Sequence, residues 1–479
     1  MTRSRNTRKK TPSGVDSTPF DVVILGGGIA GLYTAYRLLQ HSPSMRLLLV
    51  EKNKDLGGRI YTYHDPGGKM TVEAGAGRFS DAHVRLWGLL EECGLSKQVV
   101  PNGREIQYIP SGEPSGEPGV PADGPQKDLE KVFRASRGKS RAYLQKRTFV
   151  EFASEILDPT HIQDSFGYST ELVRMNAYDA IQILRTLDTQ SHTFYSLRGG
   201  LSQLIDELAR RIREFPNAVI WTEHTAVEVS PPLGGRSGRS TQKKSSGGHS
   251  PGGQSPGGQS PMARVCIRSG ARGARQWVDA RHVVFALPRP ALEAFSWMKP
   301  FRRWTSQVVC GSLCRIYSRF SPKPNRTWLD SLSKTTTNTD VRMIIPIRPK
   351  EGIVMISYSD NVFADRWVRL KKQKGIEGVN ARLAELIPRT VKGSFPTPED
   401  TQLFYWPCGV GYWGVGANSA EVSKKLIQPA PDVPFYVCGE HYSETNQQWI
   451  EGALETGEAV LARLLGSAKN VGKAFSPST

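Results

Sequence analysis

Apolar runs and helical spacing alternate over the first fifty residues. Residues 20–25 are almost entirely apolar, as in a strand buried on both faces of a parallel sheet. Glycines follow, residues 29–39 carry apolar side chains at helical spacing, and residues 46–50 form a second apolar run. This order predicts a βαβ unit of about 30 residues.

The same pattern returns far along the chain. Residues 282–288 form an apolar run closed by proline, and residues 435–438 form another, which precedes a predicted helix at 451–464. We therefore expect an α/β (α+β) fold in which a Rossmann-like domain is assembled from separated segments and interleaved with a second domain. The other predicted elements are helices at 80–94, 201–212 and 376–387, helical patches over 127–190, and strands at 218–220, 225–229, 264–267, 341–347 and 352–358.

Two segments lack the apolar side chains needed for a core. Residues 111–125 are rich in Gly, Pro and Ser and predict a surface loop. Residues 231–261 are of low complexity, and we expect a mobile exposed loop there that can be deleted without loss of the fold.

The composition of the chain excludes several classes of protein. The 479 residues are 38% hydrophobic and 9% aromatic, which excludes wholesale disorder, and no run of about 20 apolar residues could cross a bilayer. The length fits two domains, each interrupted in sequence. The six cysteines form no CxxC pair and have no His at metal-ligand spacing, so we expect reduced thiols, no metal, and a cytoplasmic protein.

The formal net charge is +18, and part of it lies outside the expected core. Residues 1–18 are basic without an apolar h-region, which predicts a disordered arm rather than a secretory signal. Such an arm could solvate the terminus, act as a nuclear address or bind nucleic acid. Because the 231–261 loop is also basic, the charge does not indicate that the folded core binds nucleic acid.

The glycines after the first strand fit the pattern GxGxxG, with Gly26, Gly28 and Gly31 at its fixed positions and Glu51 following 20 residues beyond Gly31. A glycine-rich turn is common after a strand and can be purely structural. Here it opens a helix and is followed by an acid at the end of the next strand, which predicts a dinucleotide-binding loop. The acid argues against a 2′-phosphate on the ribose.

Further motifs carry a resemblance over about residues 20–465. A Gly-Gly-Arg stretch ends at Arg59, and Leu197–Leu201, Val283–Pro288, Tyr412 among glycines, and Gly439-Glu440 with Trp449–Glu458 follow in order. Together they resemble the flavin-dependent amine oxidase family, which includes monoamine, polyamine and L-amino-acid oxidases.

This resemblance implies FAD as the cofactor. It assigns an FAD-binding domain to residues 19–95, 190–295 and 431–467 and a substrate-binding domain to 96–189 and 296–430, with a disordered tail at 468–479. The FAD contacts that it implies are Gly26, Gly28, Ile29, Ala30, Gly31, Glu51, Lys52, Gly58, Arg59, Ala76, Gly77, Arg78, Val227, Gly439, Glu440, Trp449 and Ile450.

Four residues are implied on the substrate side. Tyr412 and Trp449 match the aromatic pair in front of the flavin, although ordinary core packing also explains such residues, and Trp406 and Trp413 are weaker candidates. Arg78 matches the arginine with which L-amino-acid oxidases bind the substrate carboxylate; its alternative role is at the surface or on an FAD phosphate. Arg315 stands where many members have a lysine that is linked through water to the flavin.

A second departure concerns flavin attachment. Monoamine oxidases attach the flavin through a cysteine directly before the cage tyrosine, but Gly411 precedes Tyr412 here. We therefore expect non-covalent FAD.

The resulting hypothesis is an FAD-dependent oxidase that converts an L-amino acid to an imine, and then to a 2-oxo acid and ammonia, while O2 becomes hydrogen peroxide. A polyamine or monoamine oxidase is the first alternative, and a flavin-binding interaction protein with a nucleic-acid-binding arm is the second. We expect a small-molecule amine or amino acid partner, no membrane association, and a possible homodimer.

Overall fold

The structure is a computed structural model that describes residues 18–102, 107–109, 123–166, 169–186, 192–232, 262–391 and 395–466. The basic arm, the tail at 468–479 and nearly all of the predicted 231–261 loop lie outside these residues. So does the predicted 111–125 loop up to residue 122, and its last three residues open a helix instead. No helix within the described ranges is long and apolar enough to span a membrane.

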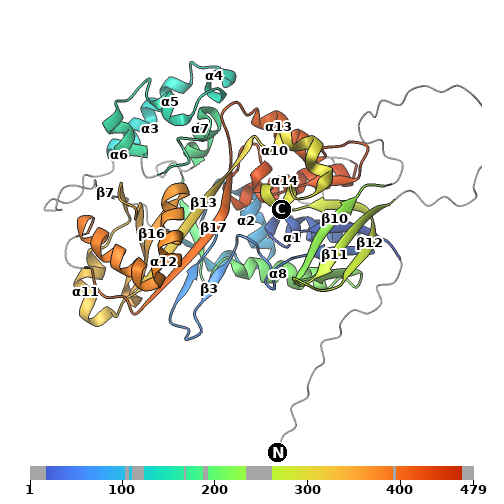
Figure 1. The fold of residues 1–479 in the computed structure, drawn as a ribbon, viewed down its shortest axis with the longest axis horizontal. Coiled ribbons are helices and arrows are strands. Elements are labelled where there is room, and N and C mark those ends of the chain that lie inside the picture. Colours follow the sequence, from blue (N-terminus) through green and yellow to red (C-terminus); the bar gives the residue numbers. More distant parts are fainter. Residues whose placement is uncertain are drawn as a thin grey trace, which may run out of the picture.

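The first sheet joins strands from both ends of the chain and lies on the right in Figure 1. Its order is β10-β11-β12-β1-β2-β9, and β18 also pairs with β12. The strands are β1 (Phe20–Leu25), β2 (Leu47–Val50), β9 (Ala218–Trp221), β10 (His224–Ser230), β11 (Ala263–Ser269), β12 (Arg275–Phe285) and β18 (Phe435–Val437).

The centre of this sheet is parallel, as the sequence predicts. β1 pairs in parallel with β2 and β12, and β12 pairs in parallel with β18. Because parallel strands need both faces covered, β1 and β2 are almost wholly buried. The carboxyl ends of β1, β2 and β18 therefore meet at one edge of the sheet.

Helices cover this sheet with amphipathic faces. They are α1 (Ile29–His41), α2 (Val84–Glu92), α8 (Ser202–Arg213) and α14 (Ile450–Leu464). In α8 the predicted apolar face, Leu204, Ile205, Leu208 and Ile212, is buried in the same core cluster as Leu32 and Leu47. Each such side chain stabilises the fold by about 1.5–3 kcal/mol relative to an exposed position.

A second sheet of six strands, in the order β17-β13-β16-β15-β14-β7, forms the other layer. Long antiparallel pairing joins β13 to both β16 and β17. The strands are β7 (Gln107–Ile109), β13 (Val308–Arg319), β14 (Thr335–Thr337), β15 (Met343–Arg348), β16 (Ile353–Asp360) and β17 (Asp400–Trp413).

The segment from residue 123 to 186 is helical, as expected, and gathers at one end of the molecule above the second sheet (Figure 1). Its core is a separate apolar cluster that also takes in Tyr412 of β17. The helices are α3 (Asp123–Ser136), α4 (Arg141–Gln145), α5 (Phe149–Ala153), α6 (Pro159–Phe166) and α7 (Ala177–Thr186).

The remaining elements are short strands and helices outside these groups, together with the long helix α12. The helix expected near 376–387 is the second half of a longer α12, in which Gly375 has a non-helical φ of 67°. The elements are β3 (Thr62–His64), β4 (Thr71–Glu73), β5 (Phe79–Ser80), β6 (Val99–Pro101), β8 (Phe194–Leu197), α9 (Arg289–Leu292), α10 (Arg302–Thr305), α11 (Pro322–Ser331), α12 (Asn361–Leu386) and α13 (Ser419–Ile427).

Candidate functional site

The glycines of the β1–α1 loop serve different purposes. A Cβ at Gly26 would lie 2.4 Å from the Ala286 carbonyl oxygen, and a Cβ at Gly31 would lie 2.0 Å from the Gly26 carbonyl oxygen. A Cβ at Gly28 would meet no atom closer than 3.8 Å. Gly26 and Gly31 thus permit close backbone packing, whereas the loop is open at Gly28.

The N-terminus of α1 faces this opening. The helix begins at Ile29 with Gly28 as its N-cap, and neither a capping side chain nor an acidic residue occupies its first turn. The N–H groups of Ile29, Ala30 and Gly31 have no partner within the helix. Such a helix end attracts a phosphate group through these donors and the helix dipole.

Glu51 lies at the end of β2 beside the same loop. Its carboxylate accepts hydrogen bonds from the backbone N–H groups of Gly27 and Asn53, both at 2.8 Å. These bonds hold the acid in place, and its remaining lone pairs can accept hydroxyl donors from a ribose. Lys52 is exposed, and Val227 lies at an irregularity in the pairing of β10 with β11.

An arginine and a glutamate link this loop region to the C-terminal motif. Arg59 forms an ion pair with Glu440, and its Nη1 atom donates to the Gly409 carbonyl oxygen at 3.0 Å. Glu440 also accepts the N–H groups of Gly411 at 3.2 Å and Gln448 at 2.9 Å. Burial opposes the charged form of Glu440, but the Arg59 guanidinium prevails and lowers the pKa of this carboxyl.

Two further glycines leave space around this pair. Gly58 has a φ of 59°, and a Cβ there would meet nothing closer than the Gly28 Cα at 3.5 Å. Gly439 has a φ of 136°, and a Cβ there would have its nearest neighbour at 3.8 Å. The backbone at both positions can therefore approach a ligand closely.

The C-terminal helix begins next to this motif. Trp449 is the N-cap of α14, Ile450 is its first residue, and the N–H of Gly439 donates to Thr456 Oγ1 at 2.9 Å. This places a second helix N-terminus in the same region as the Arg59–Glu440 pair.

Arg78 lies against aromatic rings. Its guanidinium carbon is 5.1 Å from the ring centre of Phe194 and 5.8 Å from that of Trp449. The Trp449 ring also contacts His83, with 4.7 Å between ring centres, and its Nε1 atom is buried without a hydrogen-bond partner in the described part of the chain. Of the residues predicted on the substrate side, the structure thus brings Arg78 and Trp449 together.

Tyr412 lies near Gly311 and Glu171. It is fully buried, packs with the helical segment, and its hydroxyl has no partner among the described residues. A Cβ at Gly311 would lie 3.0 Å from the Tyr412 ring and 3.2 Å from Glu171, whose carboxylate accepts the Gln448 side chain at 2.8 Å. Glu171 therefore lies near Tyr412 and is hydrogen-bonded to Gln448, the residue before Trp449.

The two weaker aromatic candidates, Trp406 and Trp413, are hydrogen-bonded to backbone carbonyl groups. Trp406 donates to the Ala74 carbonyl at 2.7 Å, and Trp413 donates to the Ser443 carbonyl at 3.1 Å and packs in the core on the far face of the first sheet. Both indoles are held by backbone acceptors.

The side chain of Arg315 lies next to Gly77. Its Nη1 atom donates to the Glu73 carbonyl at 2.9 Å and lies 3.4 Å from the position of a Cβ at Gly77. The Glu73 carboxylate itself accepts from Thr62 Oγ1 and the Leu201 N–H, and burial raises its pKa to about 7, although the charge of Arg315 opposes this. The Ala76 N–H donates to the Arg59 carbonyl at 2.8 Å.

Several residues of this region carry no local sequence signal. Burial, assisted by the charge of Asp360, raises the pKa of Glu171 to about 8. Burial and the charge of Arg78 lower the pKa of Lys334 to about 7. Of Glu171, Lys334 and Gln448, only Gln448 could have been predicted from the sequence, because it directly precedes Trp449 of the C-terminal motif.

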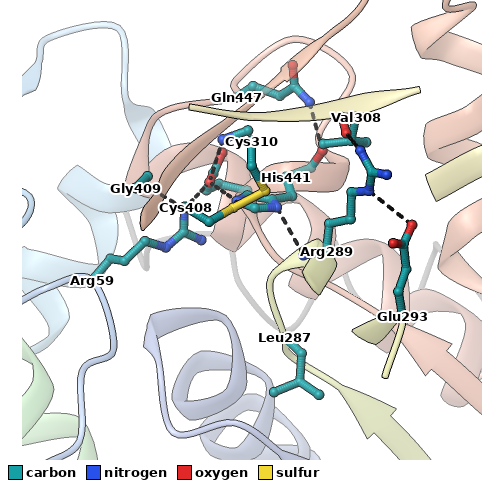
Figure 2. The surroundings of a disulfide bond; sticks show 12 residues. Arg59, Leu287, Arg289, Glu293, Val308, Cys310, Cys408, Gly409, His441 and Gln447 are labelled. Atoms are coloured by element: carbon teal, nitrogen blue, oxygen red, sulfur yellow. Dashed lines mark hydrogen bonds and ion pairs between the residues drawn. A yellow bond between two sulfur atoms is a disulfide. The ribbon is translucent and has the colours of Figure 1, made fainter. Parts of the chain in front are cut away.

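The expectation of six reduced thiols is wrong. Cys310 of β13 and Cys408 of β17 form a disulfide across 98 residues of sequence, while the other four cysteines are unpaired and buried. The pairing of β13 with β17 brings the two cysteines together, and sequence spacing does not reveal that register. Figure 2 shows the disulfide next to His441 and Arg59.

His441 is fully buried beside this disulfide. Its Nδ1 atom accepts the Arg289 N–H at 3.1 Å, so Nε2 carries the proton, 3.2 Å from Glu440 and 3.7 Å from the Cys408 sulfur. Burial lowers the pKa of His441 to about 4, which keeps the ring neutral.

Comparison with known proteins identifies the family. Residues 24–93 match the model of the NAD(P)-binding Rossmann-like domain, and residues 126–465 match that of the flavin-containing amine oxidoreductases. The second match covers most of the chain. The chain belongs to the flavin-containing amine oxidoreductase family. It is therefore an FAD-dependent oxidoreductase of this family, and the Rossmann-like architecture expected from the sequence is confirmed.

Similarity to individual amine oxidoreductases is distant. Aplysianin-A of Aplysia kurodai is 21% identical over 92% of this chain and 89% of its own length. Flavin-containing amine oxidase A of Canis lupus familiaris is 34% identical, but over only 21% of this chain and 19% of its own. Achacin of Lissachatina fulica is 31% identical over 20% of this chain and 18% of its own.

Solved structures share the fold of this oxidoreductase. Putrescine oxidase bound to putrescine superposes with a TM-score of 0.69 at 14% identity, over 93% of this chain and 99% of the other. A putative protoporphyrinogen oxidase from Exiguobacterium gives a TM-score of 0.65 at 16% identity, with the same coverage.

The residues of this chain fit the family's cofactor. The loop is open at Gly28, and the helix end there lacks acidic side chains, as a diphosphate requires. Glu51 suits a ribose that carries free hydroxyls, and the open backbone at Gly58 and Gly439 lies around Arg59 and Glu440. The donor set is that of an elongated anionic dinucleotide.

Proposed function

We propose that this oxidoreductase oxidises an L-amino acid at its α-carbon, releases the imine for hydrolysis to a 2-oxo acid and ammonia, and passes the electrons to O2 to form hydrogen peroxide. The observation that carries the proposal is the position of Arg78 against Trp449 and Phe194. FAD, when bound, accepts the hydride from the substrate.

Arg78 can bind the group that distinguishes an amino acid from a simple amine, the α-carboxylate. Its guanidinium can pair in a bidentate manner with the α-carboxylate, which fixes the orientation of the Cα–H bond. Contact with two aromatic rings restrains the side chain and shields part of the guanidinium from water, which strengthens an ion pair relative to one in bulk solvent.

The aromatic walls act on the amine. Trp449 and the buried Tyr412 provide apolar surface, which favours the neutral amine that can release hydride. The Trp449 Nε1 and Tyr412 hydroxyl groups are buried without a hydrogen-bond partner in the described part of the chain.

We also propose that FAD is held without a covalent bond. Gly411 precedes Tyr412, and a Cβ at Gly411 would lie 2.8 Å from atoms of the His441 ring. A cysteine side chain has no room there. Yellow flavin that stays with protein precipitated by acid contradicts this assignment.

The test compares L-amino acids with their decarboxylated amines in Arg78→Ala. The matched control is Arg281→Ala, because Arg281 is an exposed arginine paired with Asp21 on the outside of the first sheet. We expect kcat/KM for amino acids to fall by about 100-fold in Arg78→Ala, with amine turnover unchanged, because a charge-assisted bidentate contact contributes about 3 kcal/mol. Wild-type activity on amines alone, or full amino acid activity in Arg78→Ala, overturns the proposal.

One observation favours a second candidate, a polyamine or monoamine oxidase. Glu171 and Asp360 are buried carboxyls beside Tyr412, and burial raises the pKa of both. A cationic substrate would allow both to ionise. Turnover of diamines that is lost in Glu171→Gln and retained in Arg78→Ala supports this candidate.

A further inference from the structure

The disulfide lies against residues expected to hold the cofactor. Cys408 precedes Gly409, whose carbonyl accepts Arg59, and its sulfur is 3.7 Å from His441 Nε2. His441 in turn lies 3.2 Å from Glu440, the partner of Arg59 (Figure 2). The sulfur of Cys408, the His441 N–H and the Arg59–Glu440 pair thus form one connected group.

The two cysteines of the disulfide differ in exposure from the other four. Cys310 and Cys408 are partly exposed, whereas Cys93, Cys266, Cys314 and Cys438 are buried. Thiol–disulfide exchange requires access to a sulfur and a stable leaving thiolate, and exposure supplies the first of these conditions.

The surroundings of Cys408 supply the second condition. Because Nδ1 of His441 accepts the Arg289 N–H, its Nε2–H is fixed toward Glu440 and Cys408. This donor stabilises a negative charge on the Cys408 sulfur. The charge of Glu440, which opposes it, is balanced by Arg59, whose guanidinium donates to the carbonyl of the next residue, Gly409. Cys408 is therefore the favoured leaving group.

The same geometry disfavours a metal. Cys310, Cys408 and His441 offer three ligand atoms within 4.8 Å of one another, as a thiolate metal site would. However, the Nε2 atom that faces Cys408 carries the proton as long as Arg289 donates to Nδ1, so it has no lone pair for a cation. The Arg59 guanidinium adds positive charge beside the cluster.

We propose that Cys310 and Cys408 form a redox-active disulfide whose reduction by a small thiol weakens the Arg59–Glu440 pair and lowers the affinity of the protein for FAD. In the oxidised protein Arg59 pairs with Glu440, while His441 Nε2 lies 3.2 Å from Glu440 and 3.7 Å from the uncharged Cys408 sulfur. In the reduced protein a Cys408 thiolate competes for both donors. The proposal rests on the assignment of Arg59 and Glu440 to the FAD site.

The exchange is balanced in atoms and electrons. A thiolate RS⁻ attacks Cys310 Sγ, the Cys310–Cys408 bond breaks, and Cys408 leaves as the thiolate. A second RS⁻ attacks the R sulfur of the mixed disulfide, RSSR departs, and Cys310 is released as a thiolate. Two thiols are oxidised to one disulfide, the protein gains two electrons, and excess RSSR reverses the reaction.

Reduction should leave the fold intact. β13 and β17 remain paired from Val308–Trp413 to Arg319–Asp400, with only one irregularity, between Gly311 and Leu313. A disulfide that merely braces the chain would change the denaturation midpoint and leave cofactor affinity unchanged. FAD affinity in the native protein therefore separates the two roles.

The experiment equilibrates the FAD-loaded protein in buffers of reduced or oxidised dithiothreitol under argon. Iodoacetamide labelling and mass spectrometry locate the reduced cysteines, and free FAD is measured after ultrafiltration. We expect Cys310 and Cys408 to become labelled together in native protein while the four buried cysteines stay unlabelled. The FAD Kd should rise by about tenfold or more on reduction, as loss of one charge-assisted hydrogen bond implies.

The double variant Cys310→Ser/Cys408→Ser should bind FAD tightly in both buffers, because serine adds no negative charge. Cys314→Ala, which removes a buried cysteine of the same strand, should respond to reduction as the wild type does. Equal FAD affinity of the wild type in both buffers, or labelling of the pair only in denaturant, overturns the proposal. Neither readout involves a substrate, so both are independent of the proposed amino acid oxidation.

Discussion

Gly28 and Gly31 of the β1–α1 loop provide a matched pair of substitutions. Each change to alanine adds one methyl group, and the two sites lie three residues apart. At Gly31 the new Cβ would lie 2.0 Å from the Gly26 carbonyl oxygen, about 1.4 Å inside the 3.4 Å at which ordinary contact begins. At Gly28 the nearest atom would be 3.8 Å away.

The backbone at Gly26 cannot easily yield to a methyl group at Gly31. The Gly26 N–H donates to Val50 of the neighbouring strand at 2.8 Å, so the helix has to move instead. α1 is buried continuously from Ile29 to Leu39, and its movement disturbs the core. Overpacking of this kind costs about 1–3 kcal/mol, against a gain of at most about 1 kcal/mol in helix propensity.

We therefore expect Gly31→Ala to lower the denaturant midpoint of the cofactor-free protein by an amount equivalent to about 2 kcal/mol. Gly28→Ala should change that stability by less than about 1 kcal/mol but raise the FAD Kd by about tenfold or more, because its methyl group lies in the open side of the loop. Urea unfolding and flavin fluorescence titration measure the two effects. The reasoning fails if Gly31→Ala unfolds at the wild-type midpoint, or if Gly28→Ala binds FAD as the wild type does.

Three further predictions concern charge. Arg78→Lys should lower kcat/KM for amino acids by about tenfold, less than Arg78→Ala, because an ammonium keeps the charge and loses the bidentate geometry; an unchanged value contradicts that role. The folded-state pKa of Lys334, about 7, lies below the usual 10.5, so between these values the unfolded chain binds more protons and stability should rise with pH. Lys334→Met should show a smaller rise in midpoint from pH 7 to 9, and parallel curves would refute this. Burial lowers the pKa of His83 from 6.5 to about 4, so its contribution to stability should fall as pH drops from 6.5 toward 4; His83→Phe should flatten that acid loss, as followed by fluorescence-detected unfolding at each pH.

The parts of the site that local sequence predicts are those built from neighbouring residues. The β1–α1–β2 unit, the glycine loop of Gly26, Gly28 and Gly31, and the helix α14 follow from short-range periodicity and glycine placement. Such features depend on a few consecutive residues, and they can therefore be predicted from the sequence alone.

The parts that sequence missed depend on register between distant segments. Cys310 meets Cys408 because β13 and β17 pair in one particular alignment, in which Cys310 is opposite Gly411 and a register shift between Gly311 and Leu313 lies beside Cys408. Glu171 reaches Gln448 across 277 residues, and no local pattern encodes that contact. The early start of α12 at Asn361 was also missed, because Gly375 divides it into two helical patterns.

The connectivity of the first sheet has a consequence for biosynthesis. β1 begins at Phe20, whereas its neighbour β12 ends at Phe285 and β18 at Val437. At about 5–20 residues per second, a ribosome needs roughly 20–80 s to travel between the first and last of these strands. Until β12 has been made, β1 lacks one of its two neighbours, and until β18 has been made the expected cofactor site lacks the Gly439 motif. We therefore expect flavin to bind only after most of the chain has been synthesised.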